Sequence, residues 1–377
     1  MNGPTPLISP ADAANARRVL IVNVTRIGDT LLATPAIRAI AAFFPNAEVT
    51  CLGHPLRYTV LENLPYLAKV GAISKKSAWF RGWADVFTEP EYDYAFVWGQ
   101  DRALVGYACR KARRVIAEQQ QSARINQKLL MAFEAPPQNS IHAVAWFLSM
   151  VKASGIEPNG LGLDYVVTPA EREAAAASLY GMLGASNNLP KIGFQVASFA
   201  TKAWRDWPIS RFIELGLRIV QHYPDARFVC FGAVDDQERI AELERSLRGR
   251  VLSFAGQTTL RESAAIMSHL DLYVGIDTGP THLYGALKQP MVVMYHPTIP
   301  SALYKPIGHP AFSAIDHPLA GPRCRDQVSM IEIGIEPVWK AVENALEGEP
   351  SRLPGMPSPG LDKGLEVWPG DALPYRQ

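Results

Sequence analysis

The feature that most constrains this chain is a series of short apolar runs that alternate with segments of helical period. Val19-Leu20-Ile21-Val22 is the clearest run, bounded by polar or turn residues. A strand that is apolar on both faces is buried on both, which is typical of parallel strands covered by helices. Further candidate strands lie at 48–52, 94–98 and 113–117 in the first half, and at 191–196, 226–231, 272–276 and 291–295 in the second. The pattern predicts an α/β protein with two doubly wound parallel sheets.

Helix-period segments separate these strands, at 37–44, 211–222, 236–247 and 260–268. The strand series is interrupted at 168–190, where an alanine-rich helix at 170–183 is followed by a polar loop. We place the domain boundary there. Residues 1–183 are then an N-terminal Rossmann-like domain and 184–348 a C-terminal one, while the proline-rich stretch 349–377 is an irregular tail outside the fold.

Composition limits the classes of function. The chain has 377 residues, of which 37 are basic and 36 acidic, so the overall charge does not favour a nucleic-acid partner. The four cysteines are far apart in the sequence, which argues against a zinc ribbon or a disulfide scaffold. The first residues lack a secretory pattern, and no stretch reaches the roughly 18 apolar residues of a spanning helix. We expect a cytoplasmic protein.

A phosphate-binding turn follows the strand at 272–276, with the sequence Asp277-Thr278-Gly279-Pro280-Thr281-His282. Two facing sheets would form a cleft lined by the carboxyl ends of their strands, and this turn would lie there. Proline suits the start of a helix, whose free amides and positive dipole end suit a diphosphate. The alternative is that Asp277 or Thr278 only caps the helix and that His282 is a core residue.

A second segment, 198–208, follows another buried strand and contains Lys202 and Arg205 beside hydroxyl groups. Charge-assisted bonds from these cations would hold the same phosphates. Without the flanking motifs, solvation at the surface explains the two cations equally well.

Three motifs together resemble those of glycosyltransferase family 9, the ADP-heptose:lipopolysaccharide heptosyltransferases. They are D-T-G-P-x-H at 277–282, a cation-x-W-P segment at 205–208, and R-x-G-D-x-L-x-x-T-P at 26–35. The resemblance runs from about Val19 to Leu346, and the motifs occur in the order of the family.

The resemblance implies a GT-B fold, inversion at the anomeric carbon, and donor binding by the C-terminal domain. It places the diphosphate and sugar of the donor at Asp277, Thr278, Gly279 and His282, phosphate at Thr201 and Arg205, the ribose at Asp236, and the base or sugar near Thr258. A helix N-cap explains Asp236 equally well.

The first half contains the turn Thr25-Arg26-Ile27-Gly28-Asp29 after its first strand. This turn lacks G-x-G-x-x-G, which disfavours a nicotinamide enzyme. The resemblance makes Asp29, beside Gly28, the general base that deprotonates the acceptor hydroxyl. The alternative is a helix cap, and a carboxylate at a helix N-terminus is a weak base.

The chain contains no D-x-D tripeptide, the acidic pair that holds a divalent metal in many other glycosyltransferases. We therefore expect a reaction without metal or other cofactor. The helix end, Arg205 and Lys202 would stabilise the leaving diphosphate.

Two basic segments in the first half, 75–83 and 110–114, combine lysine and arginine with neighbouring tryptophans in the first case. They suit an anionic, lipid-linked glycan acceptor and peripheral contact with the cytoplasmic face of the inner membrane. A solvated face explains them equally well.

The chain departs from the family at 296–300, where His296-Pro297-Thr298-Ile299-Pro300 replaces the usual G-P-T-D-P. The donor sugar therefore stays open, with ADP-heptose first and a UDP-hexosamine as an alternative. A sugar-nucleotide epimerase and a non-catalytic relative that binds nucleotide sugars are further alternatives. The Gly28-Asp29 turn favours transfer over both.

Overall fold

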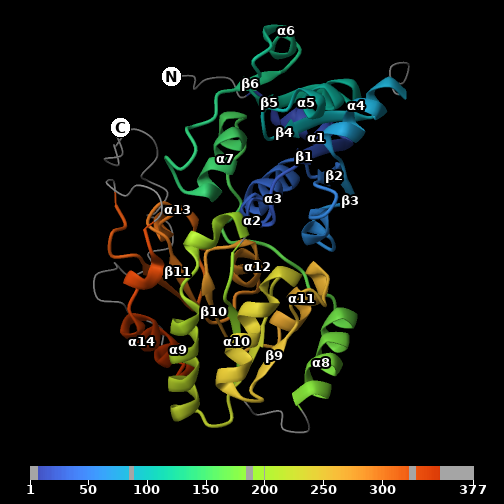
Figure 1. The fold of residues 1–377 in the computed structure, drawn as a ribbon. Helices are drawn as coiled ribbons and strands as arrows, with labels where there is room; N and C mark the ends of the chain where they lie inside the picture. Colours follow the sequence, from blue (N-terminus) through green and yellow to red (C-terminus); the bar gives the residue numbers. More distant parts are fainter. Residues whose placement is uncertain (1–6, 85–88, 184–189, 199, 322–327, 349–377) are drawn as a thin grey trace. The chain divides into compact units, whose positions relative to one another are not determined.

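The computed structural model describes residues 7–84, 89–183, 190–198, 200–321 and 328–348. The chain forms two compact units, Met1–Val166 and Val167–Gln377 (Figure 1). Each unit contains a six-stranded sheet in which every pairing is parallel. None of the described helices is long and apolar enough to cross a membrane.

The sheet of the first unit has the order β3-β2-β1-β4-β5-β6. Its central strand β1 pairs with β2 and β4, so that Val22 is opposite Leu52 on one side and Val97 on the other. The strands are β1 (Arg18–Asn23), β2 (Glu48–Gly53), β3 (Lys69–Ala72), β4 (Tyr92–Val97), β5 (Ala112–Glu118) and β6 (Met131–Phe133).

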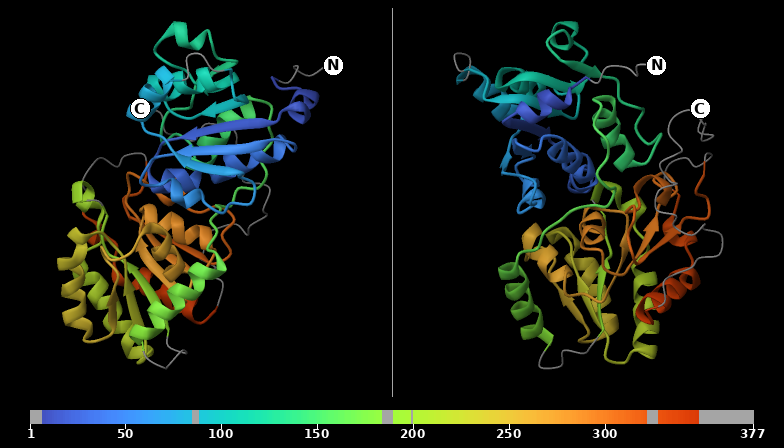
Figure 2. Two further views of the ribbon diagram at one scale, coloured as in Figure 1. Left: turned by 90° about the vertical axis from the view of Figure 1, so that its right-hand side faces the viewer. Right: turned by 180° about the vertical axis from the view of Figure 1, so that it is seen from behind.

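Helices cover both faces of this sheet (Figure 2). α4 (Lys75–Ala84) and α5 (Arg102–Lys111) pack on one face, where Leu20, Val22 and Leu104 belong to one buried cluster. α3 (Thr34–Phe43) and α7 (Ala143–Ala153) cover the other. The shorter elements are α1 (Pro10–Asn15), α2 (Ile27–Leu32), η1 (Tyr58–Leu61) and α6 (Ala123–Asn126).

The sheet of the second unit has the order β12-β11-β10-β7-β8-β9. Strand β10 lies between β7 and β11, with Gly275 opposite Gln195 and Val293. The strands are β7 (Lys191–Gln195), β8 (Arg227–Cys230), β9 (Val251–Ser253), β10 (Leu272–Ile276), β11 (Met291–Tyr295) and β12 (Phe312–Asp316).

One face of the second sheet carries the larger buried cluster, in which Phe194 and Val274 meet Phe212 and Val338. It is covered by α9 (Ile209–His222), α10 (Gln237–Leu247) and α14 (Ile335–Leu346). The other face is covered by α8 (Pro169–Leu183), α11 (Leu260–Met267) and α12 (Gly279–Leu287) (Figure 2). The shorter elements are η2 (Ala200–Arg205), η3 (Val234–Asp236), α13 (Ser301–Tyr304) and η4 (Met330–Glu332).

The expected α/β class with two parallel sheets is confirmed. Each strand predicted from the sequence is present, and the predicted helices correspond to α3, α8, α9, α10 and α11. The four strands that were not predicted, β3, β6, β9 and β12, are the outer strands of the two sheets. The expected tail 349–377 lies outside the described residues.

The division between the units differs from the expected boundary after residue 183, because α8 belongs to the second unit. Helix α8 packs on α11, and Arg261 Nε lies 2.5 Å from Glu171 Oε1. The same carboxylate accepts the Thr168 N–H at 2.8 Å, which caps the start of α8. The chain therefore enters the second unit before α8 rather than after it.

The Glu171–Arg261 pair predicts a dependence of stability on pH. Hydrogen bonding from Arg261, followed by the amide and hydroxyl of Thr168, lowers the pKa of Glu171 from 4.5 to about 2. The stabilising free energy is therefore fully present above pH 4.5 and is lost as the pH falls toward 2. We expect Glu171→Gln to lower the free energy of unfolding at pH 7 by about 1–2 kcal/mol and to flatten the decline in acid, measured by urea titration.

The matched control is Glu336→Gln, which removes an exposed carboxylate paired with Arg218. Hydrogen bonding from Arg218 also lowers the pKa of Glu336, but this pair is exposed to solvent, so Glu336→Gln is expected to flatten the acid decline less than Glu171→Gln does. An acid decline of the parent size in Glu171→Gln would contradict the assignment.

Candidate active site

The turn after β10 in the second unit begins α12. Thr278 is the extended N-cap of this helix, which begins at Gly279 and has Pro280 in its first turn. The Asp277 N–H donates to the carbonyl of Met294 at 3.2 Å, which continues the sheet one residue beyond β10. The free amides of the first turn of α12 therefore lie at the carboxyl edge of the sheet, as the sequence predicts.

Buried contacts of the Thr281 hydroxyl stabilise this turn. This hydroxyl donates to the carbonyl of Ile276 at 2.5 Å and lies 3.1 Å from the Tyr273 hydroxyl and 3.3 Å from Thr278 Oγ1. Because its single proton goes to Ile276, the Tyr273 hydroxyl donates to Thr281. Sequence reasoning did not single out Thr281, since a threonine inside a helix carries no distinctive pattern.

Asp277 and His282 face one another across the same turn. His282 Nε2 lies 3.3 Å from Asp277 Oδ1, and both side chains are less than a tenth exposed. Among the described residues, Asp277 Oδ1 and His282 Nδ1 have no hydrogen-bond partner. Unpaired buried polar atoms are costly, so this pair is suited to a ligand that supplies the missing bonds.

The loop after β7 is held rigidly at the neighbouring strand end. The Asp206 carboxylate accepts the Ser198 N–H at 2.8 Å and pairs with Arg239 at 3.2 Å. Burial raises the pKa of Asp206, while the bonds from Ser198 and the charge of Arg239 oppose that rise. The fully buried Trp207 donates its indole N–H to the carbonyl of Ile333 at 2.9 Å.

Lys202 and Arg205 lie in this fixed loop, and both are close to one indole. Lys202 Nζ is 5.6 Å and Arg205 Cζ is 5.1 Å from the ring centroid of Trp204. Both cations are half-buried, and Thr201 beside them is exposed. Since β7 and β10 are neighbours, the loop and the Asp277 turn leave the sheet side by side.

Asp236 and Thr258 lie farther along the same edge, after β8 and β9. The Asp236 carboxylate accepts the Ala233 N–H at 2.8 Å and directly precedes α10. Thr258 Oγ1 lies 2.8 Å from Ser263 Oγ. Each side chain thus has a local structural partner, although the Asp236 carboxylate makes no capping bond to α10 itself.

In the first unit, Asp29 lies at the carboxyl end of β1. It is half-buried as the third residue of α2, and Arg26 rather than Asp29 takes the N-cap. The turn is fixed by Thr30, whose hydroxyl donates to the carbonyl of Arg26 at 2.8 Å. Gly28 is buried beside Asp29.

Asn23, the last residue of β1, is a further polar group at this edge. It is fully buried, and both atoms of its amide lack a hydrogen-bond partner within the described part of the chain. The signal for it was present in the sequence, as an amide that ends an otherwise apolar strand.

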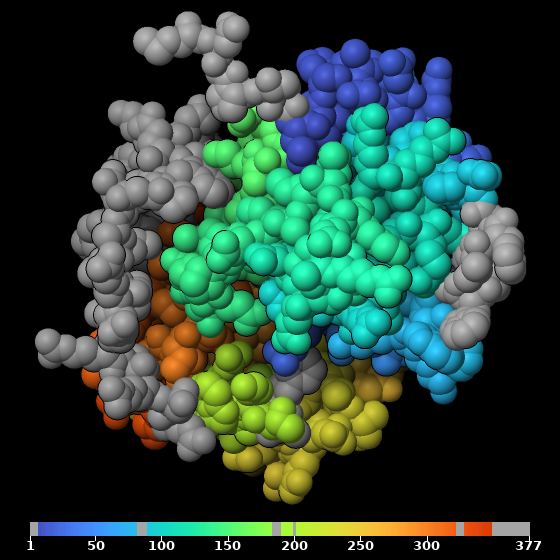
Figure 3. Space-filling model, turned by 90° about the horizontal axis from the view of Figure 1, so that it is seen from above, coloured from blue at the N-terminus to red at the C-terminus, as the bar shows by residue number. Residues whose placement is uncertain are grey.

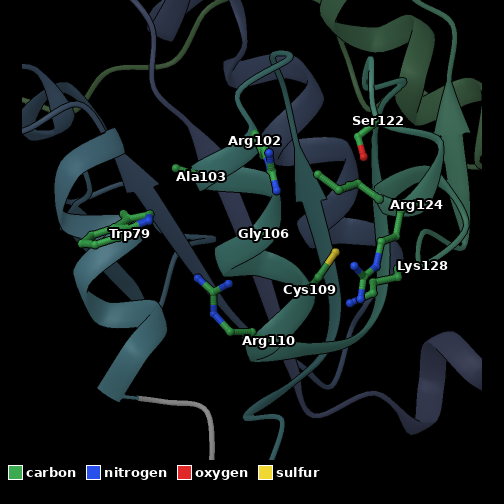
Figure 4. A pocket seen from close by; sticks show the side chains of 10 residues that line it. Trp79, Arg102, Ala103, Gly106, Cys109, Arg110, Ser122, Arg124 and Lys128 are labelled. Carbon is green, nitrogen blue, oxygen red and sulfur yellow. The ribbon is translucent and has the colours of Figure 1, made fainter.

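A pocket of about 810 Å³ opens on the helical surface of the first unit. Trp79 of α4 borders one side, α5 forms the floor, and Arg124 and Lys128 extend from the α6 side (Figure 4). The α5–α6 region occupies the centre of the face seen in Figure 3. The lining residues are Trp79, Arg102, Ala103, Gly106, Cys109, Arg110, Ser122, Arg124, Ile125 and Lys128.

The pocket is strongly cationic, with four basic side chains and no carboxylate in its lining. Burial raises the pKa of the Cys109 thiol, and the charges of Lys128 and Arg110 oppose that rise. Only some residues of the two basic segments, 75–83 and 110–114, lie at this pocket. Trp79 and Arg110 line the pocket, whereas Arg114 lies beside Asp12 at 3.4 Å.

Comparison with known proteins gives consistent matches. The family described as glycosyltransferase family 9 (heptosyltransferase) matches residues 100–326. The lipopolysaccharide core heptosyltransferase OpsX of Haemophilus influenzae is 19% identical over 283 residues, which are 74% of this chain and 79% of the relative.

Two solved structures share the fold over most of their length. A family 9 glycosyl transferase from Veillonella parvula has a TM-score of 0.77 at 18% identity, covering 90% of this chain and 100% of that one. The ADP-heptose lps heptosyltransferase II of E. coli has a TM-score of 0.70 at 17% identity, covering 88% and 99%.

The two parallel-sheet units and these structural likenesses define a GT-B fold, and the family match makes the chain a glycosyltransferase. The family match spans more than half of the 377 residues. The chain belongs to glycosyltransferase family 9 (heptosyltransferase), as the three motifs indicated.

The position of Thr281 predicts a specific effect of removing its hydroxyl. Thr281→Val deprives the Tyr273 hydroxyl and the Ile276 carbonyl of a buried partner, which costs about 1–3 kcal/mol of unfolding free energy. Thr281→Ser keeps the hydroxyl and serves as the control. Urea unfolding of both variants checks the prediction, and a smaller loss in Thr281→Val than in Thr281→Ser would show that the methyl group matters more than the hydrogen bonds.

Proposed function

We propose that this protein transfers a heptose from ADP-heptose to a lipopolysaccharide-core or related glycan acceptor, with inversion at the anomeric carbon. The single observation that carries the proposal is the D-T-G-P-x-H turn at the N-terminus of α12, in a chain of family 9. The names of OpsX and of the E. coli ADP-heptose enzyme support heptose and lipopolysaccharide core as the substrate classes.

In this proposal the donor diphosphate binds at the carboxyl edge of the second sheet. The amides at Thr278 and Gly279 and the cations of Lys202 and Arg205 neutralise its charge, which grows as the bond to the sugar breaks. Asp277 and His282 hold the sugar side of the donor through their unpaired polar atoms. Thr201 contacts phosphate, while Asp236 and Thr258 border the nucleoside.

Asp29 acts as the general base. The acceptor hydroxyl attacks the anomeric carbon in line, its proton passes to the carboxylate of Asp29, and ADP leaves with the bonding electrons. The main support for this role is the placement of Asp29 after β1, in a turn fixed by Thr30, rather than the basicity of its carboxylate.

The acceptor side of the proposal uses the cationic pocket of the first unit. Its floor is α5, which begins after β4 at the carboxyl edge of the sheet that also carries Asp29 and runs to the opposite edge, where β5 begins. Arginine clusters suit phosphate and carboxylate groups, which anionic core glycans carry. The exposed Trp79 and Phe80 beside the pocket suit a headgroup layer, which supports work at the cytoplasmic face of the inner membrane.

A second donor is favoured by one observation, the replacement of G-P-T-D-P by His296 to Pro300 beside the donor turn. This loop presents a ring and an aliphatic side chain, and both are buried. A different nucleotide sugar, such as a UDP-hexosamine, is the corresponding alternative.

A thermal-shift panel of nucleoside diphosphates tests the proposal. ADP is expected to raise the melting temperature more than UDP, GDP or CDP at equal concentration, because only the bound state is stabilised. Preference for UDP would move the function to the hexosamine alternative, and no shift with any nucleotide would refute donor binding.

Replacing Asp29 separates chemistry from donor binding. Asp29→Ala is expected to lower kcat by at least about 100-fold, since general-base catalysis contributes on that scale. ADP affinity should stay within a few-fold, because Asp29 belongs to the first unit and the donor turn to the second. Normal turnover in single-turnover assays would refute the assignment.

The cationic pocket predicts an effect on the acceptor alone. Arg124→Gln/Lys128→Gln removes two charge-assisted contacts and is expected to raise the acceptor KM about ten-fold or more, with the donor KM unchanged. Lys69→Gln/Arg245→Gln removes equal charge from exposed positions outside the pocket and is the control. Equal effects of the two pairs on the acceptor KM would point to general electrostatics.

Metal independence predicts that transfer persists after removal of divalent ions. The proposal assigns charge neutralisation to the α12 end, Lys202 and Arg205, so activity in excess EDTA should equal that in magnesium. Loss of activity in EDTA that magnesium restores would contradict it.

A further inference from the structure

An aromatic contact joins two loops on either side of the donor turn. The rings of Trp204 and His296 lie 4.5 Å apart between centroids, at an interplanar angle of 76°. Trp204 follows β7 and His296 follows β11, and β10 lies between these strands. Strands two places apart in a sheet are separated by about 9–10 Å. The two side chains together span this distance and meet beside the Asp277 turn.

His296 is a rigid partner in this contact. It is 1% exposed, and its Nδ1 accepts the Thr298 N–H at 3.2 Å, so its proton lies on Nε2, which donates to the carbonyl of Val328 at 3.2 Å. His317, which follows β12, repeats the arrangement with Leu319 and Ser329. A ring bonded at both nitrogens cannot turn away from the indole.

Trp204 in turn orders two like charges. Lys202 and Arg205 both lie within 6 Å of its ring, where the face of the indole attracts cations. Two cations held on one ring repel each other, and an anion bound between them relieves that repulsion.

We infer that Trp204, fixed by His296, is a positioning residue that aims Lys202 and Arg205 at the diphosphate of a nucleoside diphosphate donor. The inference rests on the proposed function and adds the residues that orient its cations. The His296 ring supplies the contact that fixes the indole beside the donor turn.

The test compares His296→Ala and Trp204→Leu with Trp204→Phe, which keeps an aromatic face. Binding of ADP and of adenosine is measured by calorimetry, with donor KM and kcat for transfer. We expect the first two variants to weaken ADP about three- to ten-fold with adenosine unchanged, and Trp204→Phe to recover most of the loss. Donor KM should rise by the same factor while kcat changes less.

The control is a second triad of the same kind within the second unit. The His222 ring lies 4.7 Å from Trp339, and Arg218 Cζ lies 4.9 Å from the same indole, away from the carboxyl edge. His222→Ala should leave ADP binding at the parent value.

ADP affinity at the parent level in both His296→Ala and Trp204→Leu would overturn the inference, as would an equal loss of adenosine and ADP. If Trp204→Leu does not fold, His296→Ala and Trp204→Phe decide the question. If the parent protein binds ADP and the variants match it, only this inference fails. If the parent binds no nucleoside diphosphate, the proposed function fails and this inference with it.

Discussion

Burial of both faces of two parallel sheets is the constraint on which the rest of this structure depends. Strands such as β1 and β10 are covered on both sides by helices, and their central residues are buried and carry none of the candidate site residues. Parallel strands all end at one edge, so the polar residues that follow them are brought together there. Asp29 and Asp277 owe their positions to this rule, each in its own unit.

The same constraint explains which parts of the fold were visible in the sequence. Inner strands such as β1, β10 and β11 are buried at nearly every position and contain apolar runs, so they were predicted. The outer strands β3, β6 and β9 are largely half-exposed, and β12 alternates, so their sequences lack such runs. The assignment of α8 to the second unit could not be predicted either, because the Glu171–Arg261 pair that holds this helix joins residues far apart in the chain.

The candidate site shows a parallel division. Residues at or near the start of helices that follow strands, such as Asp29 and Thr278, follow from local sequence and from the family motifs. Residues that depend on tertiary contacts do not: Thr281 matters because Tyr273 reaches it, and the cationic pocket exists because α4, α5 and α6 meet. Sequence motifs thus identify the residues at the ends of strands, whereas tertiary packing determines which side chains surround those residues.

The pocket gathers several basic side chains in one lining that contains no carboxylate. Arg239 and Arg261 lie against carboxylates, and each pair holds structural elements together. Within the described residues, no carboxylate pairs with Arg102, Arg124 or Lys128, although all three face one cavity. Bringing like charges together raises the free energy of the folded protein, and binding of an anion lowers it again. The pocket therefore suits the anionic acceptor proposed above better than a structural role.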